Sequence, residues 1–208
     1  MNLLIFGASG GTGRYLVEQA LAAGHHVTAF TRRPEKITTQ HPNLKVIEGN
    51  LQNYDSVAAA MPGHDAVLSA LGVYLFHKNT VLSDGTRNII RAMEAHNIKR
   101  FVCETAIGIG DTRDQLGLFV EFIFYPLVLR HFFPDKERQE LAIRQSKLDW
   151  VIVRPGRLTN GKQTGQYRHG FGPHEKIKGY VSRADTAEFM LRQLTDDAYL
   201  RQTPSLSY

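Results

Sequence analysis

The sequence has only one cysteine, Cys103, so it can form neither an internal disulfide nor a cysteine-rich zinc module. Its nine histidines are scattered and include no His-x-x-x-His or His-Glu-x-x-His spacing, which argues against a zinc or iron site. The N-terminus has no basic segment and only a short apolar stretch, which fits neither a signal peptide nor a membrane span. These absences predict a metal-free, soluble protein of the cytoplasm.

The composition predicts one globular domain with an anionic partner. The chain has 208 residues, of which 42% are hydrophobic and 22% charged, so residues 1–208 are treated as a single domain. Lys and Arg number 25 against 20 acidic residues, giving a net charge of +5. No nucleic-acid module and no alternation of aromatic and basic residues accompanies this charge, so we do not expect DNA or RNA to be the partner.

Short apolar runs alternate with helical patterns along the chain, which indicates a doubly wound α/β fold with about six or more parallel strands. The expected strands are 3–6, 26–30, 45–47, 66–71, 101–103 and 150–153. The first helix should end near Gly24, and later helices are expected at 55–61, 84–96 and 135–146. Ser182 with Asp185 resembles a capping box that opens a last helix through Leu194.

A glycine-rich loop, GASGGTG at residues 7–13, lies directly between the first strand and the first helix. Gly7 would allow the tight turn, Gly10 the close approach of a pyrophosphate, and Gly13 the packing of helix on sheet. Gly11 belongs to the same loop, and the Ser9 and Thr12 hydroxyls offer further donors. In this context the loop predicts a Rossmann fold that binds a dinucleotide; a merely tight strand-to-helix turn is the alternative.

The end of the second strand favours NADP(H) over NAD(H). A carboxylate at this place accepts hydrogen bonds from the adenosine ribose and repels a 2′-phosphate, but this sequence has Arg32 and Arg33 there, with Lys36 close behind. A guanidinium offers a charge-assisted fork to a phosphate. Alternatively, Arg32 and Arg33 form a solvated basic turn with no ligand.

Two more strand ends should line the cofactor groove. Asn50 and Leu51 follow the third strand, where the Asn50 amide could face the adenine. Ala70, Leu71 and Gly72 follow the fourth strand, where a glycine would keep the groove open for the ribose and nicotinamide.

The chain resembles the atypical short-chain dehydrogenases/reductases, in particular the NADPH-dependent flavin reductases, also called biliverdin-IXβ reductases. The resemblance rests on the glycine loop, the basic pair and four further segments, at 49–57, 63–72, 82–102 and 150–161. The C-terminal stretch 164–199 is similar to the same family. The resemblance implies an NADP(H)-dependent reductase that passes hydride to a flat acceptor, with FMN, FAD, biliverdin or a quinone as candidates.

The chain departs from this family at the expected catalytic positions. Tyr74 and Lys78 have the Tyr-x-x-x-Lys spacing of carbonyl reductases but follow the wrong strand, and where the pair is expected Tyr125 is followed by Leu129. Alignment with the flavin reductases gives Thr105 where they have a serine at the tip of the fifth strand.

The same alignment gives Arg157 in place of a histidine, and an arginine cannot act as an ordinary acid. It also brings Lys136 and Pro155 to the nicotinamide. Hydride transfer between stacked rings needs few acid–base groups, so flavin reduction remains the leading hypothesis. A non-catalytic NADP(H)-binding regulator or assembly factor is the alternative.

Two segments are not explained by the glycine loop. Residues 154–183 contain seven basic residues against one acid, so they either contact the anionic substrate or cofactor or form a solvated loop. Residues 116–133 contain five of the eleven phenylalanines and could be an internal helix, an aromatic wall, a homodimer face or a shallow membrane contact. We expect substrate specificity to come from loops at 106–135 and 157–180.

Overall fold

A computed structural model describes residues 1–72, 80–110, 112, 133–172, 175 and 177–208. Its main sheet has the strand order β3-β2-β1-β4-β5-β6-β10-β8, and every neighbouring pair is parallel except β10 with β8. These strands are β1 (Asn2–Phe6), β2 (His26–Thr31), β3 (Leu44–Glu48), β4 (Ala66–Ser69), β5 (Arg100–Glu104), β6 (Asp149–Pro155), β8 (Arg168–His169) and β10 (Ser205–Ser207). The predicted α/β Rossmann fold, in a single domain, is therefore confirmed.

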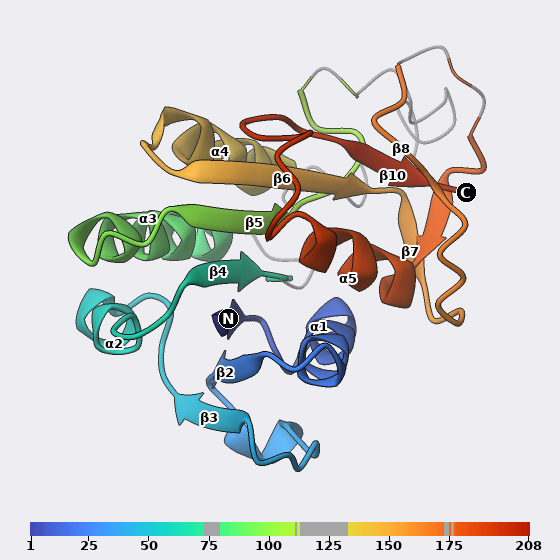
Figure 1. The fold of residues 1–208 in the computed structure, drawn as a ribbon. Coiled ribbons are helices and arrows are strands. Elements are labelled where there is room, and N and C mark those ends of the chain that lie inside the picture. Colours follow the sequence, from blue (N-terminus) through green and yellow to red (C-terminus); the bar gives the residue numbers. More distant parts are fainter. Residues whose placement is uncertain (73–79, 111, 113–132, 173–174, 176) are drawn as a thin grey trace.

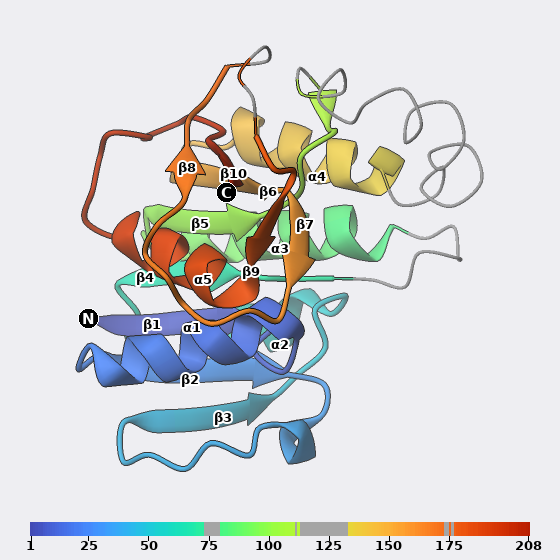
Figure 2. The same cartoon turned by 90° about the vertical axis from the view of Figure 1, so that its right-hand side faces the viewer.

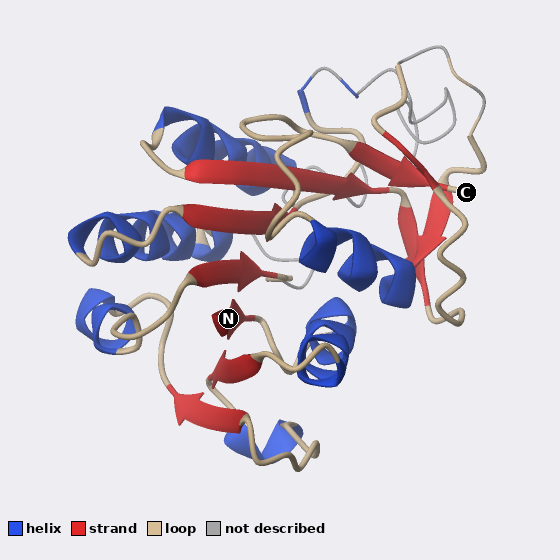
Figure 3. Ribbon diagram, in the orientation of Figure 1, coloured by secondary structure: helices blue, strands red, loops and turns tan. Residues whose placement is uncertain are grey.

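Helices cover both faces of the sheet (Figure 1, Figure 3). The helices are α1 (Gly11–Ala22), α2 (Tyr54–Ala59), α3 (Val81–Ala95), α4 (Phe133–Gln145) and α5 (Arg183–Arg192), with a 3-10 turn η1 (Pro34–Lys36) after β2. In the side view α1 and α5 lie in front of the strands, with α3 and α4 behind them (Figure 2). Two apolar clusters match these faces, one built with α1 and α5 and one with α2, α3 and α4.

The boundaries of the expected strands and helices agree with the structure to within two residues in most cases, because buried parallel strands are continuous apolar runs. Gly24 follows α1 with a φ of +80°, the left-handed conformation expected just past a helix end. Four short strands were not predicted: β8, β10 and the separate pair β7 (Arg157–Thr159) and β9 (Tyr180–Ser182). Each has two or three residues, too few to show an apolar pattern.

The predicted capping box of α5 is half correct. The Ser182 hydroxyl accepts a hydrogen bond from the Asp185 backbone N–H at 2.9 Å, as an N-cap should. The Asp185 carboxylate does not return to the Ser182 backbone N–H, which instead donates to the Tyr208 hydroxyl at 3.2 Å. Asp185 accepts from the backbone N–H groups of Thr164 and Gly165 and from the Tyr208 hydroxyl, so it attaches the preceding loop and the C-terminus to α5.

Candidate functional site

The glycine loop has the geometry that the sequence predicts. Gly7 has a φ of +78°, and a Cβ atom there would lie 2.4 Å from the Ala70 carbonyl oxygen. A Cβ on Gly13 would lie 2.0 Å from the Gly7 carbonyl oxygen, which itself accepts a hydrogen bond from the Gly10 N–H at 2.8 Å. Side chains at Gly7 and Gly13 would therefore collide with backbone, and the loop depends on glycine at both positions.

The loop ends at the N-terminus of α1, where the first backbone N–H groups have no partner within the helix. Gly10 is the N-cap residue and offers no capping side chain, and the first turn contains no acidic residue. The first turn itself therefore supplies no carboxylate to neutralise the partial positive charge of the helix. The arrangement fits the pyrophosphate of a dinucleotide, which would take the place of the missing cap.

Thr31, the last residue of β2, connects the glycine loop to the basic pair. Its Oγ1 lies 3.2 Å from the Ser9 Oγ and accepts a hydrogen bond from the Arg33 backbone N–H at 3.1 Å. Arg32 and Arg33 are both exposed. The backbone of the basic pair is thus held beside the glycine loop, while both arginine side chains remain accessible to a ligand.

Arg32 lines an open hollow of about 550 Å³ together with Glu48, Gly49 and Asn50. The Asn50 side-chain oxygen accepts from the Gln52 N–H at 3.0 Å. The hollow lies where the adenosine end of the cofactor is predicted, and it contains a carboxylate as well as a guanidinium. A smaller hollow of about 210 Å³ lies beside α1 and is lined by nine residues: Ala8, Arg14, Tyr15, Val17, Glu18, Lys36, Ile37, Thr38 and Thr39.

The tips of β4 and β5 follow the glycine loop along the same edge of the sheet, because β1, β4 and β5 run parallel. Ala70 is buried, and a Cβ on Gly72 would meet no described atom within 4 Å. Among the described residues nothing therefore fills the space beside Gly72, and its place in a cofactor groove stays a prediction. Leu51 is buried against the Gly85 position of α3, so it supports the adjacent loop from inside.

A buried acid, Glu104, lies beneath the glycine loop at the end of β5. Its Oε1 accepts a hydrogen bond from the Thr12 hydroxyl at 2.9 Å, so this hydroxyl points into the protein, and its predicted contact with the cofactor stays a prediction. Burial raises the pKa of the Glu104 carboxyl, while the charge of Lys136 and the hydrogen bond from Thr12 act in the opposite direction.

Lys136 is 2% exposed and joins the tips of two strands. Its Nζ donates to the Glu104 carbonyl oxygen at 3.2 Å and lies 3.4 Å from the Leu71 carbonyl oxygen. Burial lowers the pKa of Lys136, and the nearby acids Glu104, Glu140 and Asp135 oppose that shift. Lys136 thus lies between the tips of β4 and β5, and its contact with a nicotinamide stays a prediction.

Thr105, the predicted catalytic hydroxyl, belongs to a second buried cluster. Its Oγ1 donates to the Glu140 Oε1 at 2.7 Å, and Thr105 is 5% exposed. Glu140 also accepts from the Arg154 Nε at 3.0 Å and from its Nη2 at 2.6 Å, which makes a two-point ion pair. The Thr105 hydroxyl therefore orders α4 against β5 and β6, and its role toward a substrate stays a prediction.

The basic residues between 154 and 183 do not form one anionic-ligand surface. Arg154 is buried in its pair with Glu140, and Arg168 is paired with Glu175 on the surface. Arg157 is exposed at the start of β7, with its guanidinium carbon 5.9 Å from the centre of the Tyr180 ring. Pro155 ends β6, and its carbonyl oxygen accepts from the Ile107 N–H at 3.0 Å.

Several predicted features lie outside the described residues. These are Tyr74, Lys78, Tyr125, Leu129, Lys176 and the phenylalanine-rich segment before Phe133. Within the part of the chain that the structure describes, no helix is long and apolar enough to cross a bilayer. No group of three metal-ligating side chains is found among the same residues.

Sequence reasoning missed Glu104, Glu140 and Arg183, which lie at or beneath this groove. Glu104 follows an apolar run and Glu140 lies in a helix rich in charge, so neither has a distinguishing local pattern. Arg183 was counted only as part of the basic segment. The positions of all three depend on how distant elements dock, which no local spacing encodes.

Comparisons with known proteins identify the family of the chain. The family model for NAD(P)H-binding proteins matches residues 7–197 of the chain. The fold is similar to that of ChuY, an anaerobillin reductase from Escherichia coli, with a TM-score of 0.82 and 27% identity over 100% of this chain and 97% of ChuY. It is also similar to an NADP complex of a short-chain dehydrogenase/reductase from Veillonella parvula, with a TM-score of 0.80 and 19% identity over 100% and 94% of the two chains.

The photosystem II assembly factor Ycf39 of Synechocystis is 24% identical over 98% of this chain and 61% of its own length. This relative is named as an assembly factor, whereas ChuY is named as a reductase. The resemblance therefore reaches proteins with different activities on one nucleotide-binding fold. The match across residues 7–197, together with the glycine loop that it includes, shows that the chain belongs to the NAD(P)H-binding family of Rossmann-fold proteins.

Proposed function

We propose that this protein is an NADP(H)-dependent oxidoreductase that transfers hydride from the nicotinamide to a flat acceptor such as FMN or FAD. Biliverdin-like tetrapyrroles and quinones are further acceptors of the same shape. The observation that carries the proposal is the position of Arg32 and Arg33. They directly follow Thr31, whose hydroxyl contacts Ser9 of the glycine loop. A phosphate on the adenosine ribose would find two guanidinium groups there.

In this proposal the glycine loop and the N-terminus of α1 hold the pyrophosphate, and Arg32 binds the 2′-phosphate. Glu48 lines the same hollow as Arg32, and its carboxylate could instead accept hydrogen bonds from the ribose diol of NAD(H). Two guanidinium groups against one carboxylate favour the phosphorylated cofactor. The choice between the two cofactors therefore depends on Arg32 and can be measured.

When bound, the reduced nicotinamide supplies a hydride, which carries two electrons and one proton. Transfer of that hydride would reduce the acceptor, and a flavin would take its second proton from solvent. Arg157 is exposed, and a guanidinium in this place would attract an anionic acceptor. The strand tips at Leu71, Gly72 and Pro155 would position the ring.

The similarity to ChuY supports a tetrapyrrole as one acceptor to be tested, because that protein is named as an anaerobillin reductase. A linear tetrapyrrole and the isoalloxazine ring of a flavin are both flat and conjugated, so both could stack on a nicotinamide. The tetrapyrrole carries carboxylates and FMN carries a phosphate, so both acceptors are anionic. We therefore test flavins and tetrapyrroles together, with quinones as uncharged acceptors for comparison.

NADPH oxidation should be followed at 340 nm with FMN, FAD, biliverdin and a soluble quinone, and repeated with NADH. We expect turnover with at least one flat acceptor and a higher kcat/KM with NADPH. Absence of turnover with every acceptor would refute the oxidoreductase proposal, whatever the affinity for the cofactor.

Arg32→Ala tests the cofactor preference directly. Loss of a charge-assisted phosphate contact should weaken NADPH binding about 10- to 100-fold, since hydrogen bonds to charged groups contribute about 1.5 to 3 kcal/mol. NADH binding should change less than about twofold, because NADH has no 2′-phosphate. Lys99→Ala is the charge-matched control, since this exposed lysine precedes β5 at the opposite edge of the sheet. Equal losses for both cofactors would contradict the assignment.

A non-catalytic, NADP(H)-binding regulator or assembly factor is the second candidate. It is favoured by the use of the Thr105 hydroxyl on Glu140, which leaves that predicted catalytic group without a free proton to donate. The similarity to the assembly factor Ycf39 also supports this second candidate. Tight NADPH binding without turnover, together with a protein partner that binds only the cofactor-loaded form, would favour this function over the first.

A further inference from the structure

Arg183, the first residue of α5, lies against the phosphate loop. A Cβ atom built on Gly11 would be 2.5 Å from the Arg183 Nε and 2.8 Å from its Cδ. The arginine side chain thus occupies the space beside Gly11, the first residue of α1. The glycine leaves room for the arginine, and the two residues are 172 positions apart in the sequence (183 − 11).

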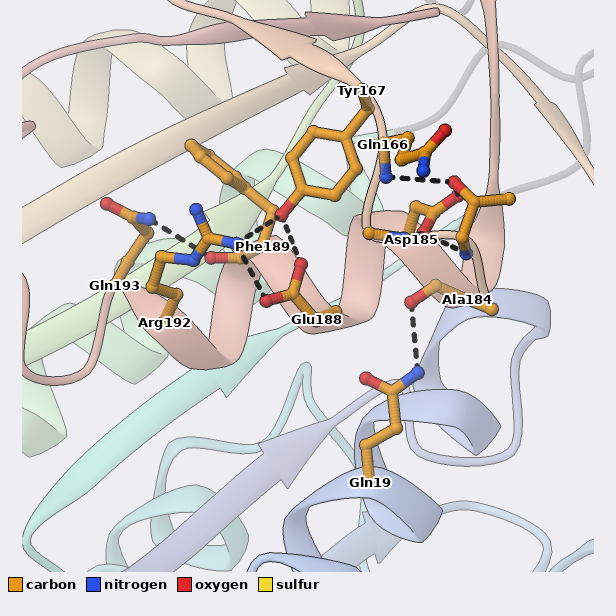
Figure 4. A network of polar contacts seen from close by, with 11 residues as sticks. Gln19, Gln166, Tyr167, Ala184, Asp185, Glu188, Phe189, Arg192 and Gln193 are labelled. Atoms are coloured by element: carbon orange, nitrogen blue, oxygen red, sulfur yellow. Dashed lines mark hydrogen bonds and ion pairs between the residues drawn. The ribbon is translucent and has the colours of Figure 1, made fainter. Parts of the chain in front are cut away.

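The contacts of α5 hold Arg183 in this place. The Gln19 Nε2 in α1 donates to the Ala184 carbonyl oxygen at 2.9 Å, which fastens the start of α5 to α1 (Figure 4). The Ser182 hydroxyl caps the same end of the helix. The Arg183 Nη1 donates to the Asn160 Oδ1 at 2.8 Å and lies 3.5 Å from the Leu158 carbonyl oxygen.

The hydrogen bonds of Arg183 to described residues all involve Nη1. The Nε and Nη2 groups form the other edge of the guanidinium fork, which is the edge that binds two oxygens of one phosphate. Since Nε lies over Gly11, this edge is next to the backbone N–H groups that begin α1. The geometry therefore brings a side-chain fork and a helix N-terminus to the same place.

The charge of Arg183 also answers an electrostatic problem at the site. Glu104 lies beneath the loop through its bond with Thr12, and an ionised carboxylate there would repel a pyrophosphate. Arg183 acts on the Glu104 carboxyl in the direction that lowers its pKa, so the two charges are close enough to interact. A cation close to both the carboxylate and the ligand would reduce that repulsion.

We propose that Arg183 is a clamp for the pyrophosphate of the dinucleotide, reaching over the N-terminus of α1 from the last helix of the fold. The proposal rests on the cofactor binding that the proposed function requires, and not on turnover or on the identity of the acceptor. It assigns different phosphates to different arginines, with the pyrophosphate at Arg183 and the 2′-phosphate at Arg32. NADPH and NADH share the pyrophosphate, so Arg183 should serve both.

The test measures dissociation constants of wild type, Arg183→Gln and Arg183→Lys for NADPH, NADH and adenosine 2′-monophosphate. Arg183→Gln should weaken NADPH and NADH by a similar factor of about 10 to 100, the range expected for a charge-assisted phosphate contact. Arg183→Lys keeps the charge without the fork and should lose about 3- to 10-fold. Adenosine 2′-monophosphate has no pyrophosphate, and its affinity should not change.

Two control variants separate a phosphate contact from a structural role. Asn160→Ala removes the hydrogen-bond partner of Arg183 and leaves its charge, so cofactor affinity should stay within about threefold of wild type. Arg192→Ala removes an arginine from the other end of α5, where it pairs with Glu188 and Tyr167 (Figure 4), and should have no effect on affinity. Circular dichroism establishes that each variant is folded.

The clamp is refuted if Arg183→Gln binds both cofactors within twofold of wild type, or if Asn160→Ala loses as much affinity as Arg183→Gln. A loss for NADPH and adenosine 2′-monophosphate without a loss for NADH would also overturn it, because Arg183 would then serve the 2′-phosphate. Normal clamp behaviour in a protein that reduces no acceptor would refute the oxidoreductase proposal alone. Failure of wild type to bind either cofactor would refute both proposals.

Discussion

Removing either partner of the buried pair of Glu140 and Arg154 should destabilise the fold by about 3 to 5 kcal/mol. Their side chains are 4% and 1% exposed, and the Arg154 Nη2 lies 2.6 Å from the Glu140 Oε2. The two effects should differ in size. After Arg154→Met, Glu140 keeps the hydrogen bond from Thr105 and the ion pair with Arg144 at 3.4 Å, whereas after Glu140→Gln the Arg154 guanidinium faces a neutral amide in place of the carboxylate.

We therefore expect the cost of Glu140→Gln to be near the upper end of this range and that of Arg154→Met near the lower end. For a chain of this length, the losses correspond to decreases in Tm of about 6 to 20 °C. The double variant should cost less than the sum of the two, because no unpaired charge is left. Urea denaturation with a common m value measures each free energy of unfolding.

Arg87→Gln is the matched control, since Arg87 and Asp84 form an ion pair whose side chains are 53% and 48% exposed. Its cost should be below about 0.5 kcal/mol. Two results would refute the reasoning: a loss below about 1 kcal/mol for both buried single variants, or strict additivity in the double variant. The first result would mean that water solvates the two side chains. The second would mean that they do not interact energetically.

Two further predictions concern single titrating groups. Burial acts to raise the pKa of Asp185, but hydrogen bonds from Tyr208, Gly165, Thr164 and Ser182 outweigh it and the pKa is lowered. Asp185 therefore stabilises the fold above its unfolded pKa of about 3.9, and this contribution is lost as the pH falls through the lower folded value. The difference in the free energy of unfolding between wild type and Asp185→Asn should be largest at pH 7 and should decrease below about pH 4. Urea midpoints at each pH measure this difference, and a difference independent of pH would contradict the prediction. Burial raises the pKa of the Cys103 thiol to about 12, so Ellman's reagent should label it only at the rate of unfolding, and rapid labelling of native protein would show that it is accessible.

The parts of the fold that were predicted are those that a short stretch of sequence determines. β1, β2 and β5 are buried on both sides and read as apolar runs. β10 was missed although its three residues are buried, because Ser205 and Ser207 are polar and the strand exists through its pairing with β6 and β8. An element that depends on its neighbours leaves little signal in its own residues.

The candidate site divides in the same way. The glycine loop could be predicted because backbone sterics at Gly7 and Gly13 require glycine wherever this turn is built. The basic pair could be predicted from its place at the end of β2. The inward direction of the Thr12 and Thr105 hydroxyls could not, since their partners, Glu104 and Glu140, are 92 and 35 residues away.

Charge counting along the chain was the weakest guide to ligand binding, and the structure shows the physical reason. Arg154 and Arg183 belong to the same basic segment, yet Arg154 is neutralised in a buried pair and Arg183 lies over the phosphate loop. A cation contributes to anion binding only where no protein carboxylate already neutralises it and where backbone donors converge with it. By that criterion we expect Arg183, together with Arg32 and Arg33 from outside the segment, to contribute to binding of the proposed cofactor phosphates, whereas the number of basic residues in 154–183 does not by itself predict an anionic acceptor.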